Sequence, residues 1–568
     1  MMTTLDLNEL LEQLHRRKKG VVSAGTAKKN SWKQVLLSGI LTAIVAGIYF
    51  YFALPALNFQ SPDFYKFLML IVVAYLVISA IVTGVQLNAA DVVANVKVNG
   101  KVALGILLVL ILIVVVGGLL SAPLFQAQAY TELMMPDTRE FSQDVAEISF
   151  DQIPMLDADS AERLGDRKLG ELADLVSQFE VSDDYTQINY QGRPTRVTYL
   201  EYGDLFKWWG NRAQGLPAVI SIDMVTQEVT VKRLEEGMKY SPSELFGRDL
   251  MRKLRFDYPT CLFGEVSFEV DENGDPYWIA SVLAKRIGLF GGTDVKGAVL
   301  LNAVTGQSQY YDLADVPTWV DRVYDADLVM EQYDNHGQYQ GGFWNSMFGQ
   351  SGVTVTTDGY NYIAMNDDVW MYTGVTSVTG DQSNVGFLLV NLRTGEPRYY
   401  TVPGATEYSA MASAQGAVQH LSYTATFPLL LNIADQPTYF MSLKDASDLV
   451  KMYAMVNVAQ YQIVATGSTV QECQENYYAL MKNAGLIDQA PATAQTTKTV
   501  KGTVGQIRSA VLEGNTYYYL QLTSGDAWYR ISAAQCPLTV ILDTGDQVTI
   551  TYVPGEEEIL EATAVERR

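Results

Sequence analysis

Three long stretches of apolar residues near the N-terminus constrain this chain more than any other feature. They run over about Val35–Leu54, Phe64–Val85 and Ala103–Leu124. Each reaches the roughly 20 residues that a helix needs to cross a bilayer. Residues 34–125 contain only five charged side chains, which are Asp63, Lys66, Asp91, Lys97 and Lys101. The sequence therefore predicts a three-helix transmembrane region over 34–125, preceded by a basic tail over 1–33.

The distribution of Lys and Arg predicts how these helices are oriented. The tail carries seven of them, and the loop between the second and third helices adds Lys97 and Lys101. The 55–63 loop has none, and the first twenty residues after the third helix have only Arg139. Because positive residues favour the cytoplasmic side, we expect a cytoplasmic N-terminus, with an extracytoplasmic ectodomain following residue 125 in a multi-pass protein of the cell membrane.

The tail and the first helix carry two further patterns. Residues 5–15 place Leu7, Leu10, Leu11 and Leu14 on one helical face, ahead of a basic cluster. This pattern predicts a short amphipathic helix that lies on the inner leaflet or docks on a cytoplasmic partner. Ala43 and Gly47 stand four residues apart in the first apolar stretch, which permits close helix packing within the chain or in an oligomer.

The charge of the ectodomain argues against one class of partner. Residues 126–568 hold thirty Lys and Arg against fifty-eight Asp and Glu, a net charge of −28. A surface this acidic repels phosphate backbones, so we expect no nucleic-acid binding. The three cysteines, Cys261, Cys473 and Cys536, show no metal-binding spacing and cannot form a disulfide framework, although one pair remains open.

A strand–turn–strand element recurs along the ectodomain. Its clearest copies share Asn-x-x-Thr-Gly-x-x-x-Tyr-Tyr at 302–311 and 391–400, and a looser copy spans 219–231. Residues 429–439 read as a shorter relative. Gly supplies a positive φ and Asn or Asp bonds the turn backbone, so we expect structural turn residues at Asp223, Asn302, Gly306, Asn391, Gly395 and Asn432.

The order of elements around 240–316 predicts a helix near 243–254, a hairpin and a closing strand–turn–strand. This order and the Thr-Gly turn resemble the PepSY-type module of bacterial extracytoplasmic proteins, with looser copies near 168–233 and 330–403. The whole chain resembles membrane-anchored, Gram-positive-type proteins of uncharacterised function. The PepSY resemblance implies a role in restraining or assisting extracytoplasmic proteases and wall hydrolases.

The predicted fold class is thus a three-helix membrane anchor, an α+β ectodomain of repeated antiparallel-sheet modules, and a small C-terminal β-barrel. The predicted boundaries are a helical connector with a first PepSY-like unit over 126–235, a second unit over 236–322, and a third unit with a short fourth hairpin and helices over 323–486. A polar linker follows over 487–499, and the last module occupies 500–568.

Six short stretches with strand-like alternation fill residues 500–565, including 539–542. With Gly502-Thr-Val504 and the Gly545-Asp546 turn, they resemble an OB-fold, a barrel that often binds oligomers. Tyr517, Tyr519 and Trp528 are the candidate interaction aromatics there. Aromatic residues on the outer face of a strand explain them equally well.

No catalytic motif is present, and the sequence predicts no catalytic, cofactor-binding or metal-ligating residue. A carboxylate pair stays open as a hydrolase centre, with Asp367-Asp368 and Asp325-x-Asp327 as candidates. The alternating Asp271, Asn273 and Asp275 read as a tight hairpin, because no acidic residue closes a calcium loop at Val282.

Three functions remain after this reading. The leading one is a non-catalytic scaffold that holds or regulates an exported protein or an envelope component. The alternatives are a carboxylate-dependent cell-wall hydrolase and an accessory subunit of a membrane transport complex.

The predicted orientation is testable with a thiol reporter placed in the C-terminal module. An impermeant maleimide applied to intact cells is expected to label it, because the positive-inside distribution puts residues beyond 125 outside. A cysteine placed in the N-terminal tail is the matched control and should react only after lysis. Protection of the C-terminal reporter until lysis would reverse the orientation.

Overall fold

The computed structural model describes residues 30–83, 98, 100–147, 153–378, 380–487, 498–512, 515–533, 536–552 and 559–567. It forms two compact units, Met1–Ala484 and Gly485–Arg568. The predicted amphipathic helix at 5–15, the basic tail up to residue 29 and most of the 487–499 linker lie outside the described residues.

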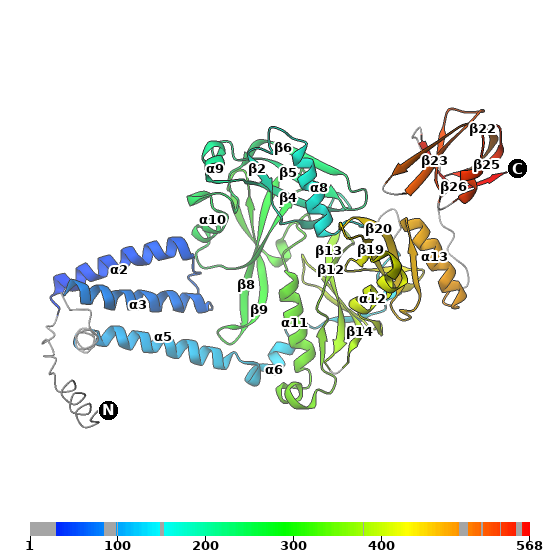
Figure 1. Ribbon diagram of the computed structural model, residues 1–568. Coiled ribbons are helices and arrows are strands. Elements are labelled where there is room, and N and C mark those ends of the chain that lie inside the picture. Colours follow the sequence, from blue (N-terminus) through cyan, green and yellow to red (C-terminus); the bar gives the residue numbers. More distant parts are fainter. Residues whose placement is uncertain are drawn as a thin grey trace, which may run out of the picture. The chain divides into compact units, whose positions relative to one another are not determined.

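The three apolar helices are confirmed as α2 (Trp32–Ala53), α3 (Pro62–Val82) and α5 (Lys101–Leu120) (Figure 1). Each is long and apolar enough to cross a membrane. Ser31 and Gln34 form a capping box that begins α2, and Pro62 begins α3, where its missing N–H costs nothing. The helices begin two or three residues before the predicted apolar stretches, because the capping residues of α2 and α3 lie ahead of the first residue of each stretch.

The ends of the helices are fixed to the β-rich region that follows. The Ser121 hydroxyl, after α5, accepts hydrogen bonds from the backbone N–H groups of Leu289 and Phe290 at 2.9 and 3.0 Å. The loop after α2 adds a bond from the Leu57 N–H to the Pro259 carbonyl at 2.8 Å.

The β-rich region contains four repeats, each a helix followed by an antiparallel sheet. Repeat 1 comprises α8 (Ala158–Gly170), β2 (Phe179–Val181), β3 (Thr186–Tyr190), β4 (Arg193–Tyr202), α9 (Leu205–Asn211), β5 (Leu216–Asp223) and β6 (Val229–Met238). Repeat 2 comprises α10 (Leu250–Asp257), β7 (Leu262–Val270), β8 (Pro276–Ile287), β9 (Gly291–Asn302) and β10 (Ser308–Asp312), after the 3₁₀ turn η2 (Phe246–Arg248).

Repeats 3 and 4 follow the same plan. Repeat 3 comprises α11 (Ala326–Tyr339), the π-helical turn η4 (Asn345–Gly349), β11 (Thr354–Thr356), β12 (Asn361–Met365), β13 (Asp368–Ser377), β14 (Gly380–Asn391), β15 (Pro397–Tyr400) and β16 (Gly404–Ala405). Repeat 4 comprises α12 (Glu407–Ala417), β17 (Thr424–Ala425), β18 (Leu429–Ile433), β19 (Gln436–Lys444), β20 (Val450–Asn457) and β21 (Val464–Gly467), with α13 (Val470–Asn483) after it.

One hydrogen-bond pattern identifies the four repeats as equivalent. The residue after each turn Asp or Asn donates its backbone N–H to the strand before, as Met224 to Pro194, Ala303 to Pro276, Leu392 to Val369 and Val458 to Pro437, at 3.0–3.1 Å. The carbonyl of that residue in turn accepts from the segment that precedes the repeat's own helix. The turn residues are therefore Asp223, Asn302, Asn391 and Asn457.

The fourth turn residue is thus Asn457, and the prediction of Asn432 is wrong. Asn432 lies in β18, where the two-residue turn to β19 is Ala434–Asp435. Its side-chain amide instead donates to the Val145 carbonyl at 2.7 Å. Asn457 lacks the Thr-Gly signal because its turn is one residue longer, with its Oδ1 accepting from the Gln460 N–H at 2.8 Å.

Other sequence predictions for this region need correction. The predicted short fourth hairpin is part of a full repeat. The stretch 444–453, which the sequence favours as helical, is instead the end of β19, a turn and the start of β20, because Asp445 accepts from the Ser447 and Leu449 N–H groups and closes the turn. The third unit does have a preceding helix, α11, which Asp325 caps by accepting from the Leu328 N–H at 2.7 Å.

Neighbouring repeats share their cores. On β8, Trp278 packs into the core with repeat 1, while the adjacent Ile279 packs into the core with repeat 3. On β14, Leu388 faces the core with repeat 2, and Leu389 faces the core with repeat 4. The inner sheets are therefore buried on both faces, which explains why their strands read as continuous apolar runs.

The segment between α5 and repeat 1, called here the connector, contains α6 (Pro123–Thr131), β1 (Asp137–Arg139) and α7 (Phe141–Asp144). It packs on repeats 3 and 4: β1 pairs in parallel with β15, and Phe141 is buried against Tyr400. Glu147 then bridges in parallel to Asn432 on β18. The connector thus extends the edges of two later sheets before the chain enters repeat 1.

The second unit contains β22 (Lys498–Leu512), β23 (Asn515–Leu522), β24 (Trp528–Ser532), η6 (Pro537–Ile541), β25 (Gln547–Tyr552) and β26 (Ile559–Arg567). The strands pair in the cyclic order β22-β23-β24-β26-β25, around Val504, Leu520, Ile531 and Ile550. In place of the strand predicted at 539–542, residues 539–541 belong to the 3₁₀ turn η6, which Pro537 begins, and Leu542 follows it in extended conformation.

The repeated turn gives a stability prediction. Gln227 adopts φ +60° at the position that Gly306 and Gly395 occupy in repeats 2 and 3. Because a side chain pays roughly 1 kcal/mol for this conformation, Gln227→Gly is expected to raise the free energy of unfolding by about 0.5–1 kcal/mol.

The opposite change should cost more. A Cβ at Gly306 would lie 2.3 Å from the Tyr240 ring, so Gly306→Ala is expected to lower the free energy of unfolding by about 1–3 kcal/mol. Gln227→Ala, which already has a Cβ there, is the matched control. Denaturant unfolding in detergent measures all three, and equal effects of both alanines would contradict this account.

Candidate functional site

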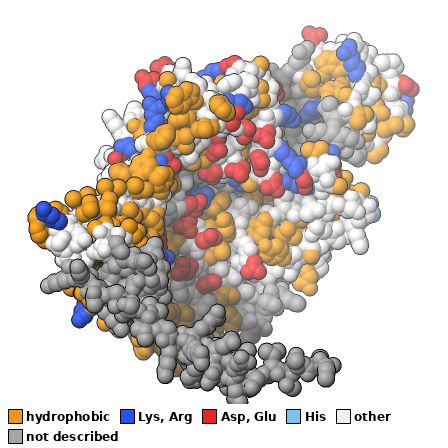
Figure 2. Space-filling view, turned by 60° about the vertical axis from the view of Figure 1, so that its left-hand side comes forward, with side chains coloured by type: hydrophobic (Ala, Val, Ile, Leu, Met, Phe, Trp, Pro, Cys, Tyr) orange, Lys and Arg blue, Asp and Glu red, His pale blue; other side chains and the backbone are white. Residues whose placement is uncertain are grey.

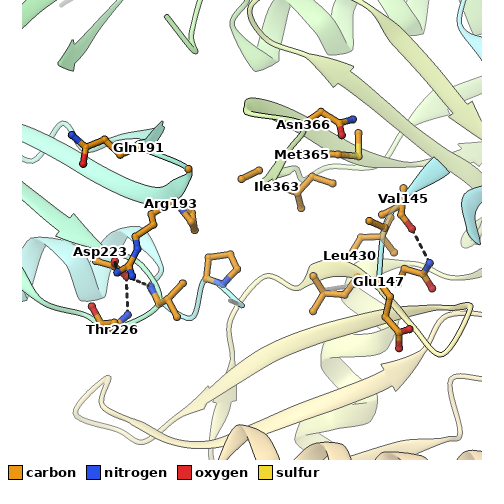
Figure 3. Close-up of a pocket in the computed structure, with 18 residues that line it drawn as sticks. Val145, Glu147, Gln191, Arg193, Asp223, Thr226, Ile363, Met365, Asn366 and Leu430 are labelled. Atoms are coloured by element: carbon orange, nitrogen blue, oxygen red, sulfur yellow. Dashed lines mark hydrogen bonds and ion pairs between the residues drawn. The ribbon is translucent and has the colours of Figure 1, made fainter. Parts of the chain in front are cut away.

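A cleft of about 550 Å³ lies where repeats 1, 3 and 4 meet the connector, and it is called here the junction cleft (Figure 3). Repeat 1 contributes Gln191 to Pro194 and the Asp223–Thr226 turn. Repeat 3 contributes residues 363–366 at the end of β12. Repeat 4 contributes Leu430 to Asn432, and the connector contributes Val145 to Glu147 with Pro154. Residues 148–152 lie outside the described part of the chain.

The two walls of the junction cleft differ in chemistry. Figure 3 shows Gln191, Arg193 and Asp223 on one side, facing Ile363, Met365 and Leu430 on the other. One wall therefore offers hydrogen-bonding groups and the other apolar contact, as in most sites that bind organic ligands or peptide side chains.

The ionisable groups of the cleft are engaged within the protein. Asp223 accepts from the Val225 and Thr226 N–H groups at 2.9 and 2.8 Å and from Arg193 at 3.0 Å. Burial acts to raise the pKa of Asp223, but these donors hold it below its ordinary value. Glu147 accepts from the Ala434 N–H at 3.0 Å. Both carboxyl groups in the described lining of the cleft thus accept hydrogen bonds within the protein.

The described lining of the cleft contains one hydroxyl side chain, that of Thr226. None of its eighteen described residues is His, Cys, Ser, Lys or Tyr. Over the described residues, no group of three or more His, Cys, Asp or Glu could hold a metal ion. What the described residues offer chemically is a mixed polar and apolar binding surface.

Behind the cleft, buried carboxyl groups join repeats 1, 2 and 3. Glu269 on β7 is fully buried and accepts from the N–H groups of Asp321 and Arg322 at 2.9 and 2.8 Å. Asp321 accepts from the N–H groups of Asn189 at 2.6 Å and Val369 at 3.2 Å. Burial raises the pKa of Glu269 to about 7, and it also raises the pKa of Asp321 well above its ordinary value.

Three of the four carboxylates considered as pairs, Asp325, Asp367 and Asp368, make structural contacts. Asp368 pairs with Arg393 through two bonds of 2.7 and 2.9 Å and accepts from the Asn391 amide at 2.7 Å. Asp367 accepts from the Asn189 amide at 2.8 Å, and Asp325 caps α11. Asp271 accepts from the N–H groups of Asn273 and Asp275, as expected of a tight hairpin.

The structure places the candidate aromatics of the C-terminal unit on one face. Tyr517 and Tyr519 alternate on β23, and Tyr519 pairs across to Arg508 and Arg530. The Arg508 guanidinium lies 4.9 Å from the Trp528 ring centroid, and that of Arg530 lies 5.5 Å from Tyr517. These arginines were missed from the sequence because only the strand register brings them beside the aromatics.

The repeat turn residues are not brought together as a site. Asp223 lies in the junction cleft, whereas Asn302, Gly306, Asn391 and Gly395 serve their own hairpins. Asn302 and Asn391 each accept from two backbone N–H groups of the turn at 2.9–3.1 Å, as Asp223 does. Residues 363–366 and Leu430, which the sequence did not single out, lie on the wall opposite Asp223 together with Asn432.

Comparisons with known proteins give little further information. No family model matches the chain, and no curated protein matches it. An ACO/RPE65 chimera aligns at 8% identity and a TM-score of 0.13, over 69% of this chain and 62% of the chimera. An exo-β-1,3-galactanase from Phanerochaete chrysosporium aligns at 11% identity and a TM-score of 0.16, over 59% of this chain and 73% of the enzyme. This chain thus spans less than two thirds of the chimera.

The buried carboxyl groups predict how stability depends on pH. With a pKa of about 7 when folded and 4.5 when unfolded, Glu269 keeps its proton in the folded protein over a range where the unfolded chain has lost it. The contribution of Glu269 to the free energy of unfolding is fully present below pH 4.5 and is lost as the pH rises through 7. The free energy of unfolding therefore falls by about 3 kcal/mol over this range.

The thermal midpoint is therefore expected to fall between pH 5 and pH 8, with a shallower slope in Glu269→Gln. Glu265→Gln is the control, because Glu265 lies on the same strand with its side chain 55% exposed. Identical pH slopes in the wild type and Glu269→Gln would rule out this origin.

Proposed function

We propose that this chain is a non-catalytic, membrane-anchored scaffold that holds or regulates an exported protein or an envelope component outside the cytoplasm. The observation that carries the proposal is the junction cleft, whose ionisable groups are engaged internally and whose opposite wall presents Ile363, Met365 and Leu430. A surface of this kind binds a side chain or an extended segment and supplies no general acid or base.

The architecture supports a scaffold further. The repeats share cores in sequence, as in stacked-repeat proteins that present extended binding surfaces. We interpret the repeats as PepSY-like and the C-terminal strands as an OB-like barrel, in which the face of Tyr517, Tyr519 and Trp528 is a second binding surface. The three apolar helices support integral membrane attachment.

The hydrolase alternative receives less support. It needs two carboxyl groups that share a cleft, one of them free to give a proton. The candidates Asp368 and Asp325 are bound to Arg393 and to the N-terminus of α11, respectively. The transport alternative gains nothing from the described residues, since the apolar helices carry few polar side chains.

The proposal is testable by photocrosslinking in native membranes. Benzoylphenylalanine at Gln191 or Met365, on opposite walls of the junction cleft, is expected to capture the same envelope component, because both side chains line one site. Tyr461, which is 53% exposed on repeat 4 outside the cleft, is the control position. Adducts are identified by mass spectrometry.

A charge on the apolar wall should weaken capture. Met365→Lys buries an unpaired ammonium against the ligand, so the yield from the Gln191 probe is expected to fall about tenfold. Adducts of the protein with itself alone, or equal adducts at Tyr461, would contradict a partner-holding cleft.

A further inference from the structure

Exposed Phe and Trp side chains are confined to a few places in the described part of the chain. Beyond the loop after α2, all of those more than half exposed belong to α6, to α9, η2 and α10, or to η4. They are Phe125, Phe206, Trp209, Phe246, Phe256, Trp344 and Phe348. Phe206 is 86% exposed and Phe348 is 77% exposed, which is costly for soluble surfaces and typical of interaction sites.

The largest group, called here the basal patch, contains Phe206, Trp209, Phe246 and Phe256. It continues directly from the end of α2. The Phe256 ring lies 5.6 Å from Phe50 and 6.3 Å from Tyr51. Phe246 lies 6.1 Å from the Trp208 ring, which in turn contacts Trp209. Figure 2 shows hydrophobic side chains extending from the apolar helices onto the β-rich region.

Backbone contacts fix this patch to the helix end. Arg252 and Arg255 of α10 donate to the carbonyls of Tyr51 and Leu54 at 3.2 and 3.0 Å. Tyr51 and Leu54 lie in and just after the last turn of α2, where a spanning helix reaches the membrane interface. The basal patch is thereby held at the level of the lipid headgroups on the side of the β-rich region.

Arginine side chains lie among these aromatic rings, although residues 126–568 as a whole are strongly acidic. The Arg212 guanidinium lies 3.5 Å from the Trp209 ring centroid, and that of Arg252 lies 4.4 Å from Tyr51. Arg212 and Arg248 have no carboxylate within ion-pair distance among the described residues. Aromatic rings with interleaved arginines are the composition that binds an anionic membrane surface.

A second group of exposed aromatic residues, Trp344 and Phe348 at η4, lies near the segment that follows α5. η4 follows α11, whose Tyr339 ring lies 6.2 Å from Tyr130 of α6 and 6.4 Å from Phe343. His336 of α11 also bonds the Thr131 carbonyl at 2.9 Å. Trp344 and Phe348 stack at 5.9 Å with exposed faces. The exposed aromatics beyond the apolar helices are thus coupled to the ends of α2 and α5.

From these contacts we propose that the basal patch inserts into the membrane leaflet that faces the β-rich region, with Phe206, Trp209 and Phe246 at the acyl boundary and Arg212 and Arg248 on anionic headgroups. The occupant is lipid and not a protein, because the patch is continuous with surfaces that lipid already covers. Its cations suit phosphate groups in a chain whose remaining surface repels them.

The test uses the full chain in nanodiscs made of phosphatidylcholine, alone or mixed equally with phosphatidylglycerol. Benzoylphenylalanine at position 206 or 246 is expected to form lipid adducts, detected by mass, at least about fivefold more often than at Tyr408. Tyr408 is a control because it is 52% exposed on α12, away from the helix ends.

The second part of the test replaces the two arginines of the patch. Arg212→Gln with Arg248→Gln should abolish the excess of phosphatidylglycerol adducts over phosphatidylcholine adducts at position 206 and leave the phosphatidylcholine adducts in place. Adducts at 206 that are no more frequent than at 408, or that join a second protein in native membranes, would overturn the proposal. These readouts do not depend on what the junction cleft binds.

Discussion

Burial of the inner sheets on both faces is the constraint on which the rest of the structure depends. The sheets of repeats 2 and 3 each contribute to two cores, so neither repeat can complete its core alone. Stability then comes from interfaces between neighbours, as in other stacked-repeat proteins. α13 closes the series by packing on β20 and β21 of repeat 4, where it buries Tyr477 and Met481.

The same stacking creates the junction cleft. Repeat 1 reaches repeat 4 through ion pairs of Asp157 with Lys444 and of Arg163 with Asp448, although Arg163 and Asp448 are 285 positions apart in the sequence. The connector crosses repeats 3 and 4 before the chain enters repeat 1. The cleft therefore forms only when three repeats and the connector are all in place, so its shape depends on the intact fold.

Repeat 2 joins the apolar helices to the other repeats. Repeat 2 carries most of the contacts to the apolar helices, through the β8–β9 hairpin and α10. Buried carboxyl groups at the junction of repeats 1 to 3 accept backbone N–H groups and make the packing sensitive to protonation. The apolar helices, the packing of the repeats and the cleft are thus connected through repeat 2 and its neighbours.

The sequence by itself determined the features that arise from local physics. Continuous apolar length predicted α2, α3 and α5, and the turn chemistry of Asn302 and Asn391 predicted their hairpins, because both signals lie within one segment. Only the tertiary structure decided that Asn457 and not Asn432 is the fourth turn residue. It also decided that Met365, Leu430 and Asp223 share a cleft and that Arg508 lies beside Trp528. These relations depend on strand register and on packing between distant repeats, which leave no periodic trace in a single sequence.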